Sequence, residues 1–162
     1  MIEWIKMNSP IGDLYILSEE ESICGISWDE SSFKKVANKK PSSSPKKTVL
    51  LQAKMQLLEY FNGERDVFDL ALSPKGTEFQ NKVWKQLQKI PFGKTKSYGD
   101  IASKINNPKA MRAVGMANRN NPIPIIIPCH RVIGSNGKLT GFAGGLDLKK
   151  RLLDFEAGLS HL

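Results

Sequence analysis

The chain has 162 residues, of which 40% are hydrophobic and 25% are charged, and its formal net charge is +8. This length and composition exclude a disulfide-held miniprotein, a collagen-like or fibrous chain and a wholly disordered one. No apolar run approaches the roughly 18 residues of a membrane span, and no secretory signal opens the sequence. We therefore expect a globular protein without a membrane partner that stays in the cytoplasm, or in the nucleus if its source is eukaryotic.

The positive charge is concentrated in the second half of the chain. Residues 1–72 contain 9 Lys/Arg and 11 Asp/Glu, whereas residues 73–162 contain 15 and 5. This asymmetry predicts a polyanionic partner, and nucleic acid is favoured over a membrane surface because no basic amphipathic helix with exposed aromatic residues is present. The two cysteines, Cys24 and Cys129, are too few for a disulfide framework, so we expect free thiols in a reducing compartment.

The first half of the chain is predicted to form a small α/β domain over residues 1–72. Short apolar runs separated by turn residues, between residues 2 and 28, predict an antiparallel sheet. Residues 29–47 are rich in Ser, Lys and Pro and predict an exposed loop. Helical spacing from Leu50 to Phe61 puts Met55 and Leu58 on the apolar face, and a short strand is expected at residues 68–72.

The second half, residues 73–162, is predicted to be mostly helical, which makes the whole chain an α+β protein. A helix is expected from Thr77 to Ile90. A helix-turn-helix follows near residues 97–119, with helices over residues 97–105 and 109–119. In its second helix the spacing predicts a buried stripe and an opposite side that is basic and small. The predicted stripe is Ala110, Ala113, Val114 and Ala117, and the opposite side is Arg112, Gly115, Met116 and Arg119.

An apolar segment over residues 123–128 ends in three reactive residues, Cys129, His130 and Arg131. Its two prolines predict an edge or irregular extended segment. An isolated Cys-His pair is more often a buried structural cysteine beside a surface histidine. A catalytic Cys129 needs a base, because a thiol with a pKa near 8.5 is only about 3% thiolate at pH 7, and His130 is the nearest one.

A nucleophile and its base also require a third group to orient the base. The last predicted helix, residues 146–157, places Glu156 on the apolar arc. A carboxylate on such an arc needs a partner, which fits the orienting role. A solvated helix end and a pair with Lys149 on the same arc are the alternatives, and spacing does not choose between them.

These residues resemble the O6-alkylguanine-DNA alkyltransferases, also called methylated-DNA–protein-cysteine methyltransferases. The signature is Pro128-Cys129-His130-Arg131-Val132, and the likeness covers nearly all of residues 73–158, whereas residues 1–72 resemble the family's ribonuclease H-like amino-terminal domain only weakly. The further motifs that carry the likeness are Gly76-Thr77-Glu78-Phe79-Gln80, Ile90-Pro91-Phe92-Gly93, Ser97-Tyr98-Gly99-Asp100-Ile101-Ala102, Arg112-Ala113-Val114-Gly115, Asn121-Pro122 and Gly141-Phe142-Ala143-Gly144-Gly145-Leu146.

The resemblance implies a role for each matching residue. Cys129 matches the alkyl acceptor, His130 the base that acts through a water, Glu156 the acid that orients the histidine, and Asn121 the hinge asparagine. Arg112 matches the arginine finger that replaces a flipped nucleotide, and Tyr98 the tyrosine that helps to rotate it. The residues implied to bind DNA are Tyr98, Arg112, Ala113, Gly115, Met116 and Arg119, and those implied to line the base pocket are Tyr98, Pro124, Phe142 and Ala143.

Two departures from the family pattern lie in the implied pocket. Some members have a hydroxyl residue at the position of Ala143 and a tyrosine at that of Phe142. Some members also bind zinc in the amino-terminal domain, but Cys24 has no neighbouring ligand that predicts a metal site. The acceptor position holds cysteine rather than the tryptophan of a binding-only group, so transfer should be intact.

The implied function is direct reversal of DNA damage. The family moves an alkyl group from O6-alkylguanine in flipped-out DNA to its own cysteine, once per molecule, and O4-alkylthymine is a further candidate substrate. The implied protein is a monomer without a cofactor, and it binds double-stranded DNA through the minor groove without sequence specificity. A Cys-His-Glu hydrolase and a purely DNA-binding module remain as alternatives from the residues alone.

Overall fold

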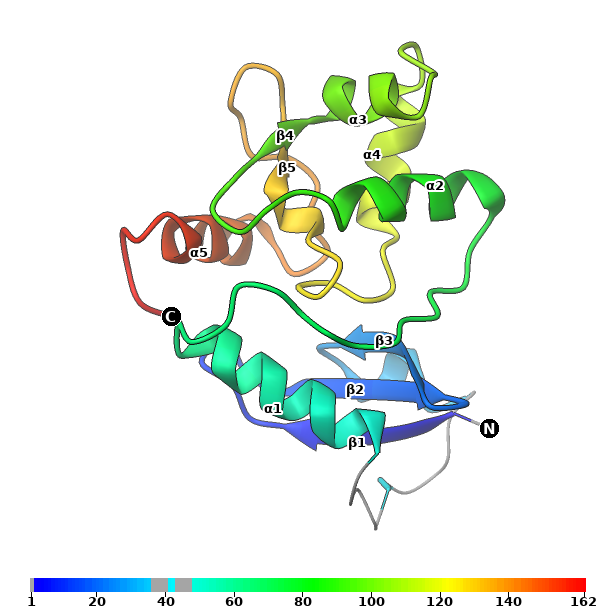
Figure 1. The fold of residues 1–162 in the computed structure, drawn as a ribbon, viewed down its shortest axis with the longest axis vertical. Coiled ribbons are helices and arrows are strands. Elements are labelled where there is room, and N and C mark those ends of the chain that lie inside the picture. The colour runs from blue at the N-terminus through cyan, green and yellow to red at the C-terminus, as the bar shows by residue number, and fades with distance from the viewer. Residues whose placement is uncertain (1, 36–40, 43–47) are drawn as a thin grey trace. The chain divides into compact units, whose positions relative to one another are not determined.

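A computed structural model describes residues 2–35, 41–42 and 48–162 of the chain. The chain forms two compact units, residues 1–75 and 76–162 (Figure 1). Most of the predicted loop at residues 29–47 lies outside the described residues; its first part contains a short 3-10 helix, Glu30–Ser32. No helix among the described residues is both long and apolar enough to cross a membrane.

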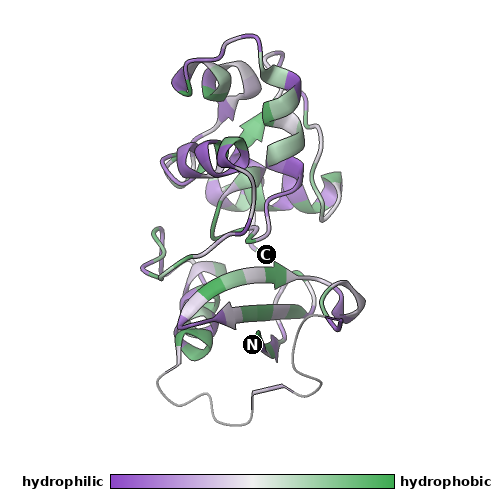
Figure 2. Ribbon diagram, turned by 90° about the vertical axis from the view of Figure 1, so that its right-hand side faces the viewer, coloured by the Kyte–Doolittle hydropathy of each residue, from purple (hydrophilic) through white to green (hydrophobic). Residues whose placement is uncertain are grey.

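The first unit is built on a three-stranded antiparallel sheet, which confirms the prediction. Its strands are β1 (Glu3–Met7), β2 (Leu14–Glu19) and β3 (Ser22–Ser27), hydrogen-bonded in that order. The central strand β2 is buried along nearly its whole length, so both faces of the sheet are covered. Figure 2 shows hydrophobic segments in these strands, interrupted by hydrophilic ones. One face carries an aromatic cluster of Trp4, Tyr15 and Phe33, whose ring centroids are 5.2 to 5.8 Å apart.

Helix α1 (Val49–Phe61) packs on the sheet (Figure 1). The Thr48 hydroxyl caps it by accepting from the Leu51 N–H at 3.4 Å. The helix is where the sequence predicts it, but its predicted apolar face is wrong, because Met55 and Leu58 are 57% and 38% exposed. The buried face of the helix instead includes Tyr60, an aromatic residue that the predicted face did not contain. The buried residues are Val49, Leu50, Ala53, Leu57, Tyr60 and Phe61.

The predicted strand at residues 68–72 is wrong. Only an isolated bridge joins Leu72 to Ile23. The reason lies at Asp69, whose backbone N–H and carbonyl are both taken by the Gln56 side chain, at 2.8 and 2.9 Å. The Asp69 N–H is therefore not available to a strand ladder, and its carbonyl already accepts one hydrogen bond.

The second unit contains four helices and a short parallel pair of strands among the described residues. Its elements are α2 (Glu78–Leu87), β4 (Lys96–Ser97), α3 (Tyr98–Lys104), α4 (Met111–Arg119), β5 (Val132–Ile133) and α5 (Leu146–Glu156), with a 3-10 turn at Cys129–Arg131. Capping boxes begin α2 at Thr77 and α3 at Ser97. Helices α3 and α4 pack together as the predicted helix-turn-helix (Figure 1).

Helix α4 differs from its prediction at its start and on its buried face. It begins at Met111 rather than at residue 109, and Ala113, predicted to be buried, is exposed. Val114, Ala117 and Asn118 form the buried face instead. The Trp84 indole N–H of α2 donates to the Ala117 carbonyl at 2.8 Å, which fixes that side of α4 against α2.

Candidate active site

The segment before Cys129 is a buried turn, so the prediction of an extended segment is wrong. The Ile127 N–H donates to the Ile123 carbonyl at 2.9 Å, which folds the chain back on itself. Ile125 occupies the turn with a φ of +72°, a left-handed conformation that a β-branched residue rarely adopts. The surrounding contacts must therefore hold this turn in place.

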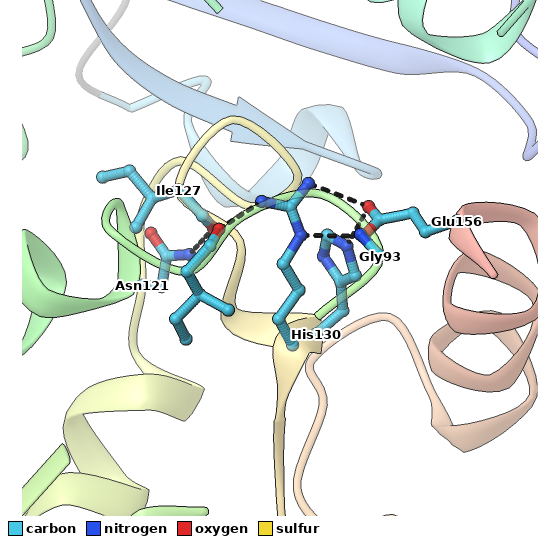
Figure 3. A network of polar contacts seen from close by, with 7 residues as sticks. Gly93, Asn121, Ile127, His130 and Glu156 are labelled. Carbon is cyan, nitrogen blue, oxygen red and sulfur yellow. Dashed lines mark hydrogen bonds and ion pairs between the residues drawn. The ribbon is translucent and has the colours of Figure 1, made fainter. Parts of the chain in front are cut away.

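Asn121 supplies those contacts (Figure 3). Its Oδ1 accepts from the Ile123 N–H at 2.9 Å and its Nδ2 donates to the Ile127 carbonyl at 2.7 Å, so one buried amide ties both ends of the turn. Asn118, on the buried face of α4, donates to the Cys129 carbonyl at 3.3 Å. Two asparagines thus connect the end of the helix-turn-helix to the backbone that carries the thiol.

Cys129 begins the 3-10 turn and is only 4% exposed. Burial raises the pKa of its thiol to about 11, although Asn121 and the positive charge of Lys149 act in the opposite direction. The side chain is therefore a neutral thiol at pH 7. A reaction that needs a thiolate must remove this proton with a base.

His130 and Glu156 form a buried pair. The two side chains are 0% and 1% exposed, and His130 Nε2 lies 2.7 Å from Glu156 Oε2. Because Glu156 is a carboxylate, Nε2 carries the proton and donates it. The other ring nitrogen, Nδ1, is also buried and has no hydrogen-bond partner within the described part of the chain. Burial lowers the pKa of His130, and this effect outweighs the opposite effect of Glu156. The lowered pKa keeps the ring neutral, so Nδ1 can accept a proton.

Glu156 is surrounded by donors (Figure 3). Its Oε1 accepts from Arg131 Nε at 2.7 Å and from the Gly93 N–H at 3.2 Å, and its Oε2 accepts from Arg131 Nη2 at 3.0 Å in addition to His130. Burial alone would raise the pKa of this carboxyl, but His130 and Arg131 overcome that effect and hold it at about 2. Glu156 is therefore neither a solvated helix end nor the partner of Lys149.

Arg131 also belongs to this network, although the sequence pattern predicted no role for it. It is 5% exposed, it holds Glu156 with two nitrogens, and its Nη1 donates to the Ile90 carbonyl at 2.7 Å. Its guanidinium also lies over the ring of Phe92, 5.8 Å from the centroid. The sequence does contain a signal for this role of Arg131, because a permanently charged residue that follows closely on an apolar run requires a counter-charge if it is buried.

Lys149 is a second residue whose part in the site was missed. Its side chain is fully buried, and its ammonium donates to the backbone carbonyls of Val132 at 2.5 Å and Thr140 at 2.8 Å. Burial lowers its pKa to about 8, with Cys129 opposing the shift. Its position on α5 between Leu148 and Leu152, both buried, was the signal in the sequence.

A groove of about 680 Å³ lies over α3, α4 and residues 134–141. Five of the six residues predicted to bind DNA line it: Tyr98, Arg112, Gly115, Met116 and Arg119. The sixth, Ala113, is exposed but does not line the groove. The structure therefore brings most of the predicted DNA-binding residues onto one concave surface.

The residues predicted to line a base pocket do not all lie on one surface, unlike most of those predicted to bind DNA. The Tyr98 hydroxyl donates to the Thr140 carbonyl at 3.1 Å and accepts from the Thr140 hydroxyl at 3.0 Å. Pro124 and Phe142 are buried, Ala143 is exposed, and none of these three lines the groove that contains Tyr98. Their role in binding a base stays a prediction.

Comparison with known proteins extends the likeness to the whole chain. Residues 78–158 match the model of the DNA binding domain of 6-O-methylguanine DNA methyltransferase, and residues 2–74 match the model of its ribonuclease-like domain. The methylated-DNA–protein-cysteine methyltransferase of Methanosarcina acetivorans is 49% identical over 91% of this chain and 94% of its own length. The constitutive enzyme of that name from Bacillus subtilis is 46% identical over 91% of each chain.

Solved structures agree. The crystal structure of Mycobacterium tuberculosis O6-methylguanine methyltransferase superposes with a TM-score of 0.85 at 41% identity, over 99% of this chain and 95% of the other. The Mycobacterium tuberculosis OGT in complex with DNA gives a TM-score of 0.88 at 42% identity, over 98% and 95%. Sequence and structure together place this chain, through both of its units, in the 6-O-methylguanine DNA methyltransferase family.

Proposed function

We propose that this protein repairs alkylated DNA by moving an alkyl group from O6 of guanine to the sulfur of its own Cys129. Relatives named methylated-DNA–protein-cysteine methyltransferase, at 46 to 49% identity over nearly the full length, support this activity. The observation that carries it is Cys129 directly beside the buried His130–Glu156 pair, with His130 Nδ1 unpaired within the described chain. This is the arrangement that a buried thiol of high pKa needs in order to react.

The proton of Cys129 moves to His130 Nδ1. A bridging water carries this proton if the two side chains are not in direct contact. The resulting thiolate attacks the alkyl carbon, so an Sγ–C bond forms as the C–O6 bond breaks. The guanine leaves with its bonding electrons and takes back the proton from His130. Glu156 stabilises the charged ring between these steps, and Arg131 keeps Glu156 ionised.

The product determines how often the protein can act. Attack on a saturated carbon gives a thioether, which offers water no carbonyl to attack. Cys129 therefore stays alkylated, and each molecule reacts once. A hydrolase with the same three side chains would form a thioester and turn over repeatedly, so the count of turnovers separates the two chemistries.

The groove over α3 and α4 supports binding of the damaged duplex. We assign α4 to the minor groove, where its small Gly115 allows a close approach, and Arg112 to the gap left by the extruded nucleotide. Tyr98, at the edge of the groove, guides the rotating nucleotide. Contacts to phosphates and to the minor groove carry little sequence information, so binding is expected on any sequence around the lesion.

The acting unit is a single chain with no cofactor, since the reaction consumes only the thiol and the alkylated base. Free thiols at Cys24 and Cys129 suit a reducing compartment such as the cytoplasm, or the nucleus if the source is eukaryotic. O4-alkylthymine presents an alkyl carbon on an equivalent base oxygen and is assigned as a second substrate. A duplex that carries this base tests it in the assay below.

Mass spectrometry of the intact protein after incubation with an O6-methylguanine duplex tests the proposal. The wild type should gain one methyl group on Cys129 and then stop. Cys129→Ser should bind the duplex but gain nothing, whereas Cys24→Ser, the matched control, should be methylated like the wild type. Methylation of Cys24, repeated turnover, or transfer by Cys129→Ser would each overturn the assignment.

A further inference from the structure

A second groove, of about 700 Å³, lies in the same unit on α2, β4 and α3. Its apolar lining comes from Ile90 and Ile101, which are both 3% exposed. Three exposed lysines, Lys89, Lys96 and Lys104, also line it. Lys89 lies in the turn after α2, Lys96 on β4 and Lys104 on α3, so the fold and not a run of sequence brings these charges together.

None of these three lysines forms an ion pair within 4 Å of a carboxylate in the described chain, although Lys96 lies near enough to Asp100 to help lower the pKa of that carboxyl. Some exposed lysines are paired, as in Lys150 with Asp154, and others such as Lys85 and Lys94 are not, so the three groove lysines are distinguished by their convergence on one concavity. The surrounding sequence is strongly basic as well, with seven lysines and one acidic residue between positions 82 and 109. Unpaired cations that converge on one concavity favour an anionic occupant.

The acidic residue in that stretch, Asp100, also lines the groove. Its carboxylate accepts from the Ser97 N–H at 2.9 Å, and its own N–H donates to the Ser97 hydroxyl at 3.0 Å, which forms the capping box of α3. Its presence is therefore explained by the start of the helix. It reduces the positive charge of the groove but does not reverse its sign.

The second groove shares no lining residue with the first. Helix α3 contributes to both: Tyr98 and Gly99 face the first, whereas Asp100, Ser103 and Lys104 face the second. A duplex held at α4 therefore leaves the lysines of the second groove available. In helix-turn-helix proteins the first helix crosses the DNA backbone while the second enters a groove.

We propose that Lys89, Lys96 and Lys104 bind the sugar–phosphate backbone of the strand that borders the minor groove holding α4. The proposal rests on the proposed function for the placement of α4. Because α3 packs against α4 and the first helix of a helix-turn-helix crosses the DNA backbone, we place α3 over the strand beside this minor groove. The lysines then extend the DNA footprint beyond the residues that read the lesion.

Salt dependence tests this, because each phosphate contact contributes about 0.9 to the slope of log K against log salt concentration. Binding of a short duplex with one O6-methylguanine is measured by anisotropy for the wild type and for Lys89→Gln/Lys96→Gln/Lys104→Gln. The slope of the triple variant should fall by about two to three units. A control triple, Lys34→Gln/Lys35→Gln/Lys150→Gln, removes the same charge from exposed sites outside both grooves and should keep the wild-type slope.

Equal slopes for the two triple variants would overturn the proposal. A difference in slope that appears only when the duplex is in excess over the protein would also overturn it. Sedimentation would then detect two duplexes on one protein, and the occupant of the second groove would be a separate DNA molecule.

Asp100→Asn, which keeps an acceptor for the cap, should tighten binding by about two- to five-fold. At low salt, saturating duplex should methylate the groove variant fully. Loss of methyl transfer in the wild type itself would instead reject the proposed function.

Discussion

Lys149 and Tyr98 donate hydrogen bonds to the same backbone oxygen, that of Thr140, at 2.8 and 3.1 Å. Lys149 also donates to the Val132 carbonyl, three residues after Cys129. One buried ammonium therefore joins the strand that follows the thiol to the edge of the groove that contains Tyr98. Both acceptors are neutral, so nothing in this pair of contacts balances the charge of Lys149.

This unbalanced charge predicts a stability that increases with pH. Folding lowers the pKa of Lys149 from 10.5 to about 8, so the folded chain holds this proton less tightly than the unfolded chain does. Between pH 7 and pH 9 the free energy of unfolding of the wild type should rise by about 1 kcal/mol relative to Lys149→Met. Urea denaturation at the two pH values measures the difference.

The matched control for this prediction is Lys150→Met, which removes a neighbouring lysine that is exposed and paired with Asp154. Its stability should follow that of the wild type across the same pH range. A constant difference between wild type and Lys149→Met would mean that Lys149 does not lose its proton in this range.

Glu156→Gln should slow methyl transfer by about a hundred-fold or more in a single-turnover assay. The amide cannot stabilise a charged His130, and its NH₂ group faces donors rather than acceptors. Duplex affinity should stay within about two-fold, because Glu156 is buried below the surface. The variant should also be less stable, since Arg131 loses its buried counter-charge.

A control on the same helix separates chemistry from folding. Asp154→Asn removes a carboxylate that pairs with Lys150 near the surface of α5, and it should leave the rate unchanged. Rates are compared at a temperature where far-ultraviolet circular dichroism shows both variants folded. A wild-type rate in folded Glu156→Gln would remove the carboxylate from the mechanism.

Cys129 should stay protonated well above neutral pH in the free protein. In Cys24→Ser, where it is the remaining cysteine, the ultraviolet absorbance of thiolate should not appear below about pH 9, because burial raises the pKa of Cys129 to about 11. The unfolded protein in denaturant should titrate near 8.5, as a free thiol does. Similar midpoints in the folded and unfolded protein would show that the thiol is activated before it meets DNA.

Arg112 should behave as a stacking group rather than as a phosphate contact. A planar guanidinium stacks and hydrogen-bonds as an ammonium cannot, so Arg112→Lys should also be impaired in transfer from duplex DNA. If Arg112 only neutralised a phosphate, Arg112→Lys would keep binding and rate, and Arg112→Ala would lower the salt slope by about one unit.

The free base serves as the control for Arg112. O6-methylguanine or an O6-benzyl analogue needs no extrusion from a duplex, so both Arg112 variants should react with it nearly as the wild type does. Equal losses on duplex and free base would show that Arg112 supports the pocket or the fold instead.

The sequence predicts those parts of the fold that local chemistry determines. Thr77 and Ser97 begin helices in the sequence as they do in the structure, because their capping partners lie three residues away. The strand expected near Asp69 is absent because Gln56, thirteen residues earlier, takes its backbone groups. The buried side of α4 depends on Trp84 in another helix, so the alanine spacing put Ala113 on the wrong side.

The same division holds for the site. Cys129 and His130 are adjacent and carry a recognisable signature, and the likeness to the family supplied Glu156. Spacing alone left Glu156 open to a pair with Lys149, because the choice depends on Arg131 and Gly93 reaching the carboxylate from distant segments. The turn at Ile125 could not be predicted either, since the hydrogen bonds of Asn121 hold a backbone conformation that isoleucine does not favour by itself.

The four donors around Glu156 come from two segments, the turn Cys129–Arg131 and the loop at Gly93, and the carboxylate itself lies on α5. During synthesis on the ribosome, Cys129 and His130 emerge before this helix does, because the chain is made from its amino terminus. In a nascent chain the histidine has no carboxylate to orient it, and the arginine beside it has no counter-charge. His130 is thus oriented as a base only once α5 has docked, so methyl acceptance would report completed folding of the second unit.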